Sequence, residues 1–506
     1  MPANLNLVYR DFSKGHFGTL GIFAAPEGTF FGKNVIRSRE GVLHPRPGTE
    51  VYPTAGSSVG EVHALGWNGV AGRDVWVLIN QTVFHRDGAS LASGWTAATG
   101  TITAEPNEQC PFWEVRPGIT YILVPGQGLW KLDLTSAPGA LTQVAAVTAD
   151  MAGRALAVWG ERLFIGGWDP GRRVYYSEPG DFETWPAANF FDVGPASQVR
   201  VLIAQRQHLA VALQDGSWYV MTGSTPATGT IRSVIGPQGT WHFWTNSAVR
   251  TNDDMIWMVP NQGTWPAAFD GSQVAELRHL EYAPTQGNIA GEQNVVAGRM
   301  RDEVLFISGE PSSRGEAIFL TNGTWTKHSI GGDIAGGVVS DGQKYIYLHD
   351  FGGPAVAPHV YRLDVQNNGD PGGVVGALGD ESSTDPLDAE VHLPGFWSED
   401  GQEVCVRQII VDGWKWDTGA ATDNTLDAAI HTYGQTHLDG PQVHSLDAWT
   451  EAASSSPAGG ERVRWIWNIG PRWNGGGFQV RFPALTGVGI EQVIVKVERA
   501  ASLPRA

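Results

Sequence analysis

The chain has 506 residues, and its 52 Asp and Glu against 34 Lys and Arg give a formal net charge of −18. A chain this long exceeds one ordinary domain and can bury a large core without disulfides or metal ions. The acidic balance argues against a dedicated nucleic-acid-binding protein, and the 17% charged and 10% aromatic residues argue against coiled coil and disorder.

Cysteine usage and apolar runs restrict the class of protein further. Cys110 and Cys405 are too few for a disulfide framework, and their wide separation gives no ground for predicting a bridge. The N-terminus lacks a basic segment followed by an apolar one, so we expect no secretory signal. No run of about 20 apolar residues occurs, so we expect no membrane span. We also expect no cofactor and no metal ion.

Residues 1–57 form the first distinct stretch. They are rich in Gly and Pro and include the turn-like sequence Pro-Arg-Pro-Gly at 45–48. This composition predicts an extended N-terminal arm that runs onto the following domain and completes its last sheet.

Short apolar segments bounded by Gly, Pro, Asn or Asp dominate residues 58–366. Their β-branched and aromatic content predicts β-strands, and no span longer than about 10 residues keeps a helical period. The predicted strands are Val75–Ile79, Val83–His85, Thr120–Val124, Leu129–Leu134, Ala155–Trp159, Leu163–Gly166, Arg173–Ser177, Val199–Ala204, Leu209–Leu213, Trp218–Thr222, Met255–Val259, Ala267–Asp270, Val304–Ser308, Ala317–Leu320, Tyr345–His349 and Val360–Val365.

These strands recur as hairpin units whose centres are roughly 40 residues apart, which is the period of a β-propeller blade. Gly-Thr-Trp or Gly-Ser-Trp tripeptides accompany them at 216–218, 239–241, 263–265 and 323–325. We therefore predict an all-β protein with a β-propeller over 58–366, of about seven blades, with six or eight also compatible with the spacing. Its tryptophans are expected to fill the space between blades.

The pattern stops near residue 366. Residues 367–390 are polar and turn-rich and predict a linker. Residues 391–506 resume the alternation of a sheet with one buried face, with predicted strands at Val404–Asp412, Arg462–Ile469, Phe478–Phe482 and Ile490–Glu498. In the last of these, Val493, Val495 and Val497 are expected to face one way and Ile494, Lys496 and Glu498 the other. These residues predict a C-terminal β-sandwich.

No strong catalytic motif is present, and we predict a protein that is not an enzyme. The segment 56–60, Gly-Ser-Ser-Val-Gly, matches a nucleophile elbow, but that motif needs a helix after it and a strand-like segment follows here. His431, His437 and His444 form a loose group without diagnostic metal-ligand spacing. The acidic pairs at 380–381 and 399–400 are expected to be solvated loops. The sequence therefore nominates no catalytic, cofactor-binding or metal-binding residue.

Three passages stand out as a group. The first, 162–186, combines a strand pair, the turn Ser177-Glu178-Pro179-Gly180-Asp181 and an aromatic anchor. The second consists of 11–15 and 41–49 near the N-terminus, and the third of 478–482 and 487–498 near the C-terminus. Together they resemble tail proteins of tailed bacteriophages, namely the tail nozzle (tail tubular B) proteins of podophages and propeller-bearing minor tail proteins.

The resemblance implies a structural subunit of the virion, made in the bacterial cytoplasm and assembled as a ring, expected to be sixfold. Its partners would be copies of itself and other tail proteins such as an adaptor, tail tube or tail fibre. DNA would pass transiently through the lumen, and an acidic wall would repel phosphates and let DNA slide. The skew of the basic residues toward Arg fits a large permanent interface, although a GC-rich genome explains it equally well.

Two other functions stay open at this point. A receptor- or glycan-binding protein at the tail tip could stack sugars on Trp414, Trp416 or Trp473, although core packing also accounts for these residues. A propeller hydrolase acting on surface polysaccharide is the third hypothesis. The sialidase-type box that would support it is only a fragment at 214–218, and it does not repeat.

Overall fold

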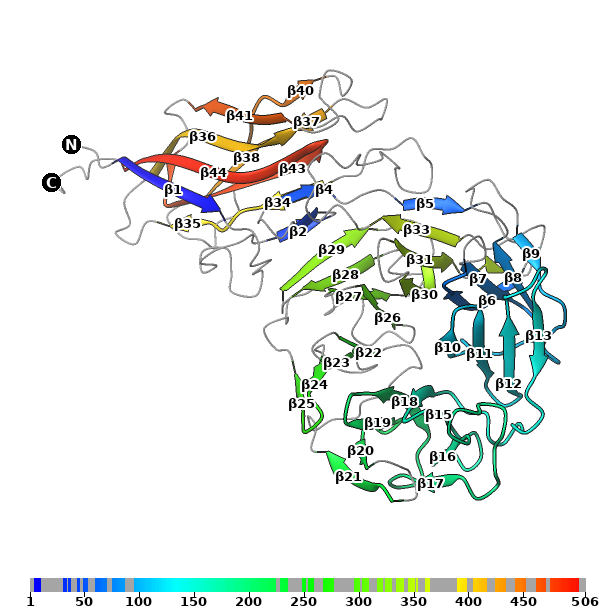
Figure 1. Ribbon diagram of the computed structural model, residues 1–506. Coiled ribbons are helices and arrows are strands. Elements are labelled where there is room, and N and C mark those ends of the chain that lie inside the picture. The colour runs from blue at the N-terminus through cyan, green and yellow to red at the C-terminus, as the bar shows by residue number, and fades with distance from the viewer. Residues whose placement is uncertain are drawn as a thin grey trace. The chain divides into compact units, whose positions relative to one another are not determined.

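A computed structural model gives the structure of the chain (Figure 1). It describes residues 4–10, 31–33, 35–37, 43–45, 49–52, 60–70, 75–86, 95–223, 228–234, 248–251, 254–258, 267–276, 295–300, 303–308, 316–321, 324–329, 334–340, 345–350, 352–353, 360–364, 389–397, 404–415, 424–433, 442–451, 461–469 and 474–499. All regular elements within these ranges are β-strands. The prediction of an all-β protein is therefore confirmed.

The chain divides into two compact units. The propeller unit comprises Glu50–Ala317 and Ile330–Leu363. The sandwich unit comprises Met1–Thr49, Ile318–Ser329 and Asp364–Ala506. The predicted limits of 58–366 and 391–506 differ from these bounds chiefly because the N-terminal arm belongs to the sandwich unit.

Seven sets of strands follow one another along the chain and correspond to the predicted blades. The first set is β6 (Gly60–Trp67), β7 (Val75–Ile79), β8 (Thr82–Arg86) and β9 (Trp95–Ala97), with β32 (Gly352–Gly353) beside β6. The next four are β10 (Phe112–Arg116), β11 (Ile119–Val124), β12 (Gly128–Asp133) and β13 (Ala140–Gln143); β14 (Leu156–Trp159), β15 (Arg162–Gly166), β16 (Arg173–Tyr176) and β17 (Phe190–Asp192); β18 (Val199–Ala204), β19 (His208–Leu213), β20 (Trp218–Thr222) and β21 (Thr230–Val234); and β22 (Ala248–Arg250), β23 (Ile256–Met258), β24 (Ala267–Phe269) and β25 (Val274–Glu276).

The sixth set starts in the propeller unit with the hairpin of β26 (Val295–Met300) and β27 (Glu303–Ser308). It is followed along the chain by β28 (Glu316–Thr321), which belongs to the sandwich unit from Ile318 on, and by β29 (Thr324–Ser329), which belongs wholly to that unit. The seventh is a sheet of β30 (Ile334–Ser340), β31 (Tyr345–Asp350), β33 (Val360–Asp364) and β5 (Thr49–Tyr52), in that order. The outermost strand of the last sheet thus comes from the N-terminal arm, as the arm was predicted to supply it. A sheet that combines the first and the last segments of a propeller closes the ring of blades. It leaves no long strand edge unpaired.

The first strand of each set lies innermost, and these strands contact one another in a ring. β10 contacts β14, β14 contacts β18, β18 contacts β22, β22 contacts β26, β26 contacts β30, and β30 contacts β6. The ring is completed between the first and second blades. There the backbone N–H of Cys110, two residues before β10, donates to the carbonyl of His63 in β6 at 2.7 Å. The residues that the structure describes therefore form a propeller of seven blades.

Apolar side chains from neighbouring blades form separate cores between them. Between the first two blades, Trp76 is fully buried together with Leu78, Ile122 and Trp130. Trp76 packs edge-on against Phe112 of the second blade, with ring centroids 5.0 Å apart. The expectation that tryptophans fill the space between blades is confirmed for Trp76 and for Trp218, which is buried in the core between the fourth and fifth blades.

Short Asp side chains fix several hairpin turns. In three of them, one carboxylate oxygen accepts hydrogen bonds from both the backbone N–H and the hydroxyl of the residue two positions later. The pairs are Asp133 with Thr135, Asp215 with Ser217 and Asp270 with Ser272. Such Asx turns let a polar tripeptide reverse the chain without a long loop. The fragment at 214–218 is one of these turns, which gives it a structural role.

An ion pair between the third and fourth strands of the third blade gives a testable pH effect. Arg173 donates to both carboxylate oxygens of Asp192 at 2.8 and 3.2 Å, and this holds the pKa of Asp192 below its usual range. A lowered pKa means that the stabilisation is present above about pH 4 and is lost as the pH falls. We expect Asp192→Asn to lower the free energy of unfolding by about 0.2–1 kcal/mol at pH 7 and by less at pH 3. Urea unfolding at both pH values measures this.

The sandwich unit consists of two sheets. The first sheet has the order β3 (Val35–Arg37), β4 (Leu43–Pro45), β44 (Val488–Arg499), β36 (Val404–Lys415) and β41 (Glu461–Asn468); β1 (Asn4–Arg10) also pairs with β44, and β42 (Asn474–Gly475) with β36. The second sheet contains β2 (Phe31–Lys33), β34 (Ala389–His392), β43 (Gly477–Thr486), β37 (Asn424–Leu426) and β40 (Trp449–Glu451). It also includes β35 (Phe396–Trp397), β38 (Ala429–Tyr433) and β39 (Gln442–Ser445), and β29 adjoins β2 in parallel.

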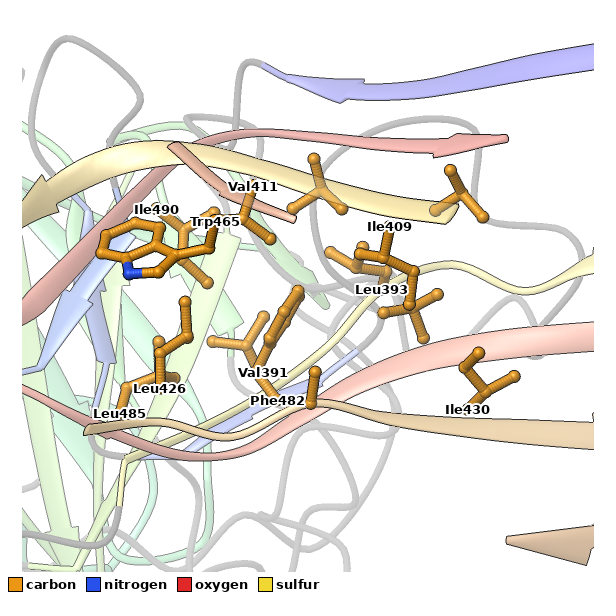
Figure 2. Packing of buried hydrophobic residues seen from close by; sticks show 14 of the residues in the cluster. Val391, Leu393, Ile409, Val411, Leu426, Ile430, Trp465, Phe482, Leu485 and Ile490 are labelled. Atoms are coloured by element: carbon orange, nitrogen blue, oxygen red, sulfur yellow. The ribbon is translucent and has the colours of Figure 1, made fainter. Parts of the chain in front are cut away.

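The inner faces of these sheets form one apolar core (Figure 2). Ile409, Val411 and Ile490 come from the first sheet and meet Val391 and Phe482 of the second, and all five are fully buried. Val493, Val495 and Val497 of β44 also face this core, as their alternation predicted. The predicted C-terminal β-sandwich is thus confirmed as a fold.

The N-terminal arm is mostly part of this sandwich, which corrects the prediction that it runs onto the propeller. Among the arm's strands that the structure describes, β5 alone joins the propeller. β1 pairs with β44 along its full length, from Asn4 beside Glu498 to Arg10 beside Gln492. Its alternating Leu5, Leu7 and Tyr9 pack against the sandwich core. The physical reason is the two-residue apolar period of 5–9, which demands a buried face that an extended arm does not provide.

The Gly-Thr-Trp and Gly-Ser-Trp tripeptides do not mark one position in each blade, since 216–218 leads into the third strand of its set and 323–325 into the fourth; those at 239–241 and 263–265 lie outside the described residues. The predicted linker 367–390 also lies outside them, except that β34 already begins at Ala389.

Candidate interaction surface

The surface of the first sandwich sheet that faces away from the core is the strongest candidate for a functional site. Four neighbouring strands build it, in the order β41, β36, β44 and β1. Side chains alternate along each strand, so every second residue points outward from the sandwich. We call this surface the outer face.

An apolar row crosses the outer face at right angles to its strands. Ile410 of β36 lies in register with Ile466 of β41 on one side and with Ile494 of β44 on the other, and Ile494 lies in register with Val8 of β1. Val8 and Ile466 are 47% and 51% exposed. These two side chains, at the ends of the row, are reached by water, whereas Ile410 between them is only 8% exposed. Exposed apolar side chains at both ends of one row indicate an interaction site.

Ion pairs within the chain flank the row. Arg464 donates to both carboxylate oxygens of Asp412 at 2.5 and 2.9 Å, and this raises the pKa of Arg464 above its usual value. Arg462 contacts Glu491 at 2.9 Å. Arg407 donates to Glu498 at the opposite border of the row. The acidic groups of the outer face are thereby neutralised inside one chain.

Two cations of the outer face stand apart from these pairs. Lys496 follows Ile494 on its strand by two residues, and Arg10 follows Val8 by two residues, so both point outward next to the row. Neither forms an ion pair with any residue that the structure describes. The outer face therefore carries a positive surplus, although the whole chain has a net charge of −18.

Trp414 also points outward, in register with Arg462 on β41, and is half-buried. An exposed Ile, here Ile466, beside Trp and Arg is typical of protein–protein contact sites, in which Trp and Arg carry much of the binding energy. Of the three tryptophans considered for sugar stacking, this is the one the structure places on a surface. Trp416 and Trp473 lie outside the described residues.

The predicted loose histidine group is not brought together. His431 and His444 lie on paired strands, but His431 is opposite Val443 and His444 is opposite Ile430, so they point to opposite sides of the sheet. His444 contacts the hydroxyl of Thr432 at 3.0 Å. His437 lies outside the described residues. Within the described ranges, no group of three or more His, Cys, Asp or Glu side chains could hold a metal ion.

Burial, and beyond it the nearby charges of Arg481 and His392, lowers the pKa of His431 to about 4. An unfolded chain protonates its histidines near pH 6.5. Stability from the neutral side chain is therefore complete above about pH 6.5 and is lost as the pH falls toward 4. We expect His431→Gln to reduce the loss of stability between pH 7 and pH 4.5, as measured by urea unfolding. An unchanged pH dependence would contradict this assignment.

The other residues considered from the sequence have structural positions. A strand, β6, follows the elbow-like segment 56–60 from Gly60 onward, as expected, so the strand-to-helix turn that this motif needs is not formed. Cys110 and Cys405 are both buried and unbridged, and burial raises the pKa of the Cys110 thiol well above its usual value. The acidic pairs at 380–381 and 399–400 lie outside the described residues.

Sequence reasoning missed the outer face as a site. The alternation of 493–498 did place Ile494 on the polar side of its strand, which was a readable signal of an exposed apolar residue. Its three apolar neighbours come from other strands, far away in sequence, and only strand register brings them together.

Comparisons with known proteins give propellers but no family. No family model and no curated protein matches the chain. Among solved structures, streptogramin B lyase is 13% identical, over 62% of this chain and 97% of that one, with a TM-score of 0.46. Raptor of Chaetomium thermophilum is 10% identical, over 65% and 30%, with a TM-score of 0.46. BamB from Moraxella catarrhalis is 13% identical, over 71% and 98%, with a TM-score of 0.39.

These likenesses are too distant to say anything about activity or partners. The described part of the chain also contains no helix that is long and apolar enough to cross a membrane.

Proposed function

We propose that this chain is a structural, non-enzymatic subunit of a bacteriophage tail, and that copies of it assemble into a ring through which DNA leaves the virion. In this role it resides in the virion and contacts neighbouring tail proteins as well as other copies of itself. The ring is expected to contain six copies.

The apolar row of the outer face is the observation that carries the proposal. A monomer that works alone gains nothing from keeping Val8 and Ile466 half exposed to water. Complete burial of such a side chain contributes about 1.5–3 kcal/mol, and roughly half of this is forgone here. A subunit of a permanent assembly buries such a row against a neighbour. The row therefore favours a role in assembly.

The position of the passages that resemble phage tail proteins supports the same role. The passage 41–49 contains β4, and the passage 487–498 forms most of β44. These strands pair, with Leu43 beside Ile490, although they lie at opposite ends of the chain. The two terminal passages thus belong to one sheet, and that sheet bears the outer face. The passage 162–186 similarly forms the centre of the third blade.

The net charge of −18 suits a conduit. An acidic wall repels the DNA backbone, so the nucleic acid passes without binding, whereas a basic wall would hold it through released counterions.

The mass of the purified protein in solution, measured by light scattering together with negative-stain imaging, tests the proposal. We expect rings of about six copies. A stable monomer or trimer that adsorbs to host cells would contradict the conduit role.

Such a result would favour receptor or glycan binding at the tail tip. The one observation that favours this second function is Trp414, which is half-buried on the outer face beside Arg462 and could stack against a sugar. Loss of cell adsorption in Trp414→Ala, with unchanged mass in solution, would identify it.

A further inference from the structure

The charge of the outer face indicates the charge of the surface that it binds. Asp412, Glu491 and Glu498 are each paired with an arginine of the same chain. Lys496 and Arg10 then leave a positive surplus on this face, while the remaining surface carries all of the net negative charge of the chain. Complementary potentials draw such a face toward an acidic protein surface.

We propose that the outer face binds the acidic surface of a second copy of this chain, head to tail. This inference rests on the proposed ring-forming function and adds which surface makes the contact. In a head-to-tail contact two different surfaces meet, and repetition of that contact closes a ring when the rotation between copies permits.

Charge also decides against the alternative in which two outer faces meet each other. A two-fold contact of this kind would place Lys496 and Arg10 of one copy near the same residues of the other. Like charges that face each other across a contact cost several kcal/mol. A head-to-tail contact instead sets these cations against carboxylates, so the surplus becomes attractive.

Burial of the apolar row contributes the binding free energy. The two cations determine which surface of the second copy is bound. Ile410 and Ile494 form the floor of the row, and Ile466 and Val8 project at its ends. Strands about 4.8 Å apart that rise about 3.3 Å per residue give the four-stranded face an area of roughly 500 Å². Stable interfaces bury about 800 Å² on each partner. One such contact is therefore weak. Ring closure adds one further contact without adding a copy, so that every copy then has two, and this stabilises the assembly.

The test uses the full chain and two variants. Lys496→Glu combined with Arg10→Glu reverses the surplus, and Ile466→Asp places a charge in the row. We expect each to weaken self-association at least tenfold in sedimentation velocity, with the thermal unfolding midpoint unchanged because these side chains point away from the core. Arg116→Glu, a charge reversal at an exposed propeller position, is the matched control and should assemble as the wild type does. Wild-type association should also weaken as salt rises.

Mixing the charge-reversed variant with the wild type distinguishes a head-to-tail contact from a contact between two outer faces. The Lys496→Glu/Arg10→Glu variant loses its outer face but keeps its acidic surface, so it should still bind one wild-type copy and stop further growth. Labelled variant should therefore appear in short complexes with wild type. Its exclusion from every complex would overturn the head-to-tail contact.

The outcomes distinguish this inference from the proposed function. If the wild type forms rings and both variants form them equally well, the outer face is not the contact and this inference fails, while the ring proposal stands. If the wild type stays monomeric at every salt and protein concentration, the ring proposal itself fails.

Discussion

Replacement of Trp76 by Ala is expected to lower the free energy of unfolding of the propeller by about 3–5 kcal/mol. Trp76 is completely buried between the first and second blades, and its ring packs edge-on against Phe112. Gly66 shows how tightly the site is filled, because a Cβ at that position would lie 2.2 Å from the Trp76 ring. A cavity left by the indole is bordered by rigid sheets on both sides, so it can collapse only slightly.

Urea unfolding followed by far-ultraviolet circular dichroism measures the effect, because it does not depend on the fluorescence of the removed indole. The matched control is Trp168→Ala. Trp168 is half-buried and lies under the Arg154 guanidinium, 4.5 Å from its ring centroid. Its loss should cost only about 0.5–1 kcal/mol. Equal shifts for the two variants would mean that Trp76 does not hold the first two blades together.

The second and third strands of the blades were predictable from sequence, whereas of the innermost first strands only β14 and β18 were among the predicted strands. β7, β18 and β20 begin and end at the predicted residues. Such strands are buried on both faces, so they read as continuous apolar runs between turns. The fourth strands, apart from the one that the arm supplies, were not predicted. β13 and β17 have only four and three residues, so their few apolar side chains form no alternation that separates them from loops.

The arm shows a different limit of sequence reasoning. The alternation in Asn4–Arg10 was readable as a strand, but nothing in it says which sheet it joins. Its partner is the last strand of the chain, more than 480 residues away, and contacts of this separation leave no local trace. The outer face follows from the same pairing, because β1 supplies both Val8 and Arg10.

Leu7→Asp is expected to destabilise the sandwich unit by about 3–5 kcal/mol, whereas Val8→Asp, one residue further on, should change its stability by less than about 0.5 kcal/mol. Leu7 points inward from β1 and packs against the core, so a carboxylate there loses apolar burial and is itself desolvated. Val8 points outward and is already 47% exposed, so a carboxylate there stays in water.

The readout is hydrogen exchange resolved along the chain. In Leu7→Asp the amides of β44 and β36 should exchange faster, since β1 covers one edge of β44, while those of the propeller strands stay unchanged. Val8→Asp should leave all of these rates as in the wild type. It should nevertheless weaken self-association, because it places a charge at the end of the apolar row. Two adjacent substitutions on one strand thus separate a folding role from a docking role. Equal destabilisation by both would mean that β1 is not held in this register, and the outer face would lose Val8 and Arg10.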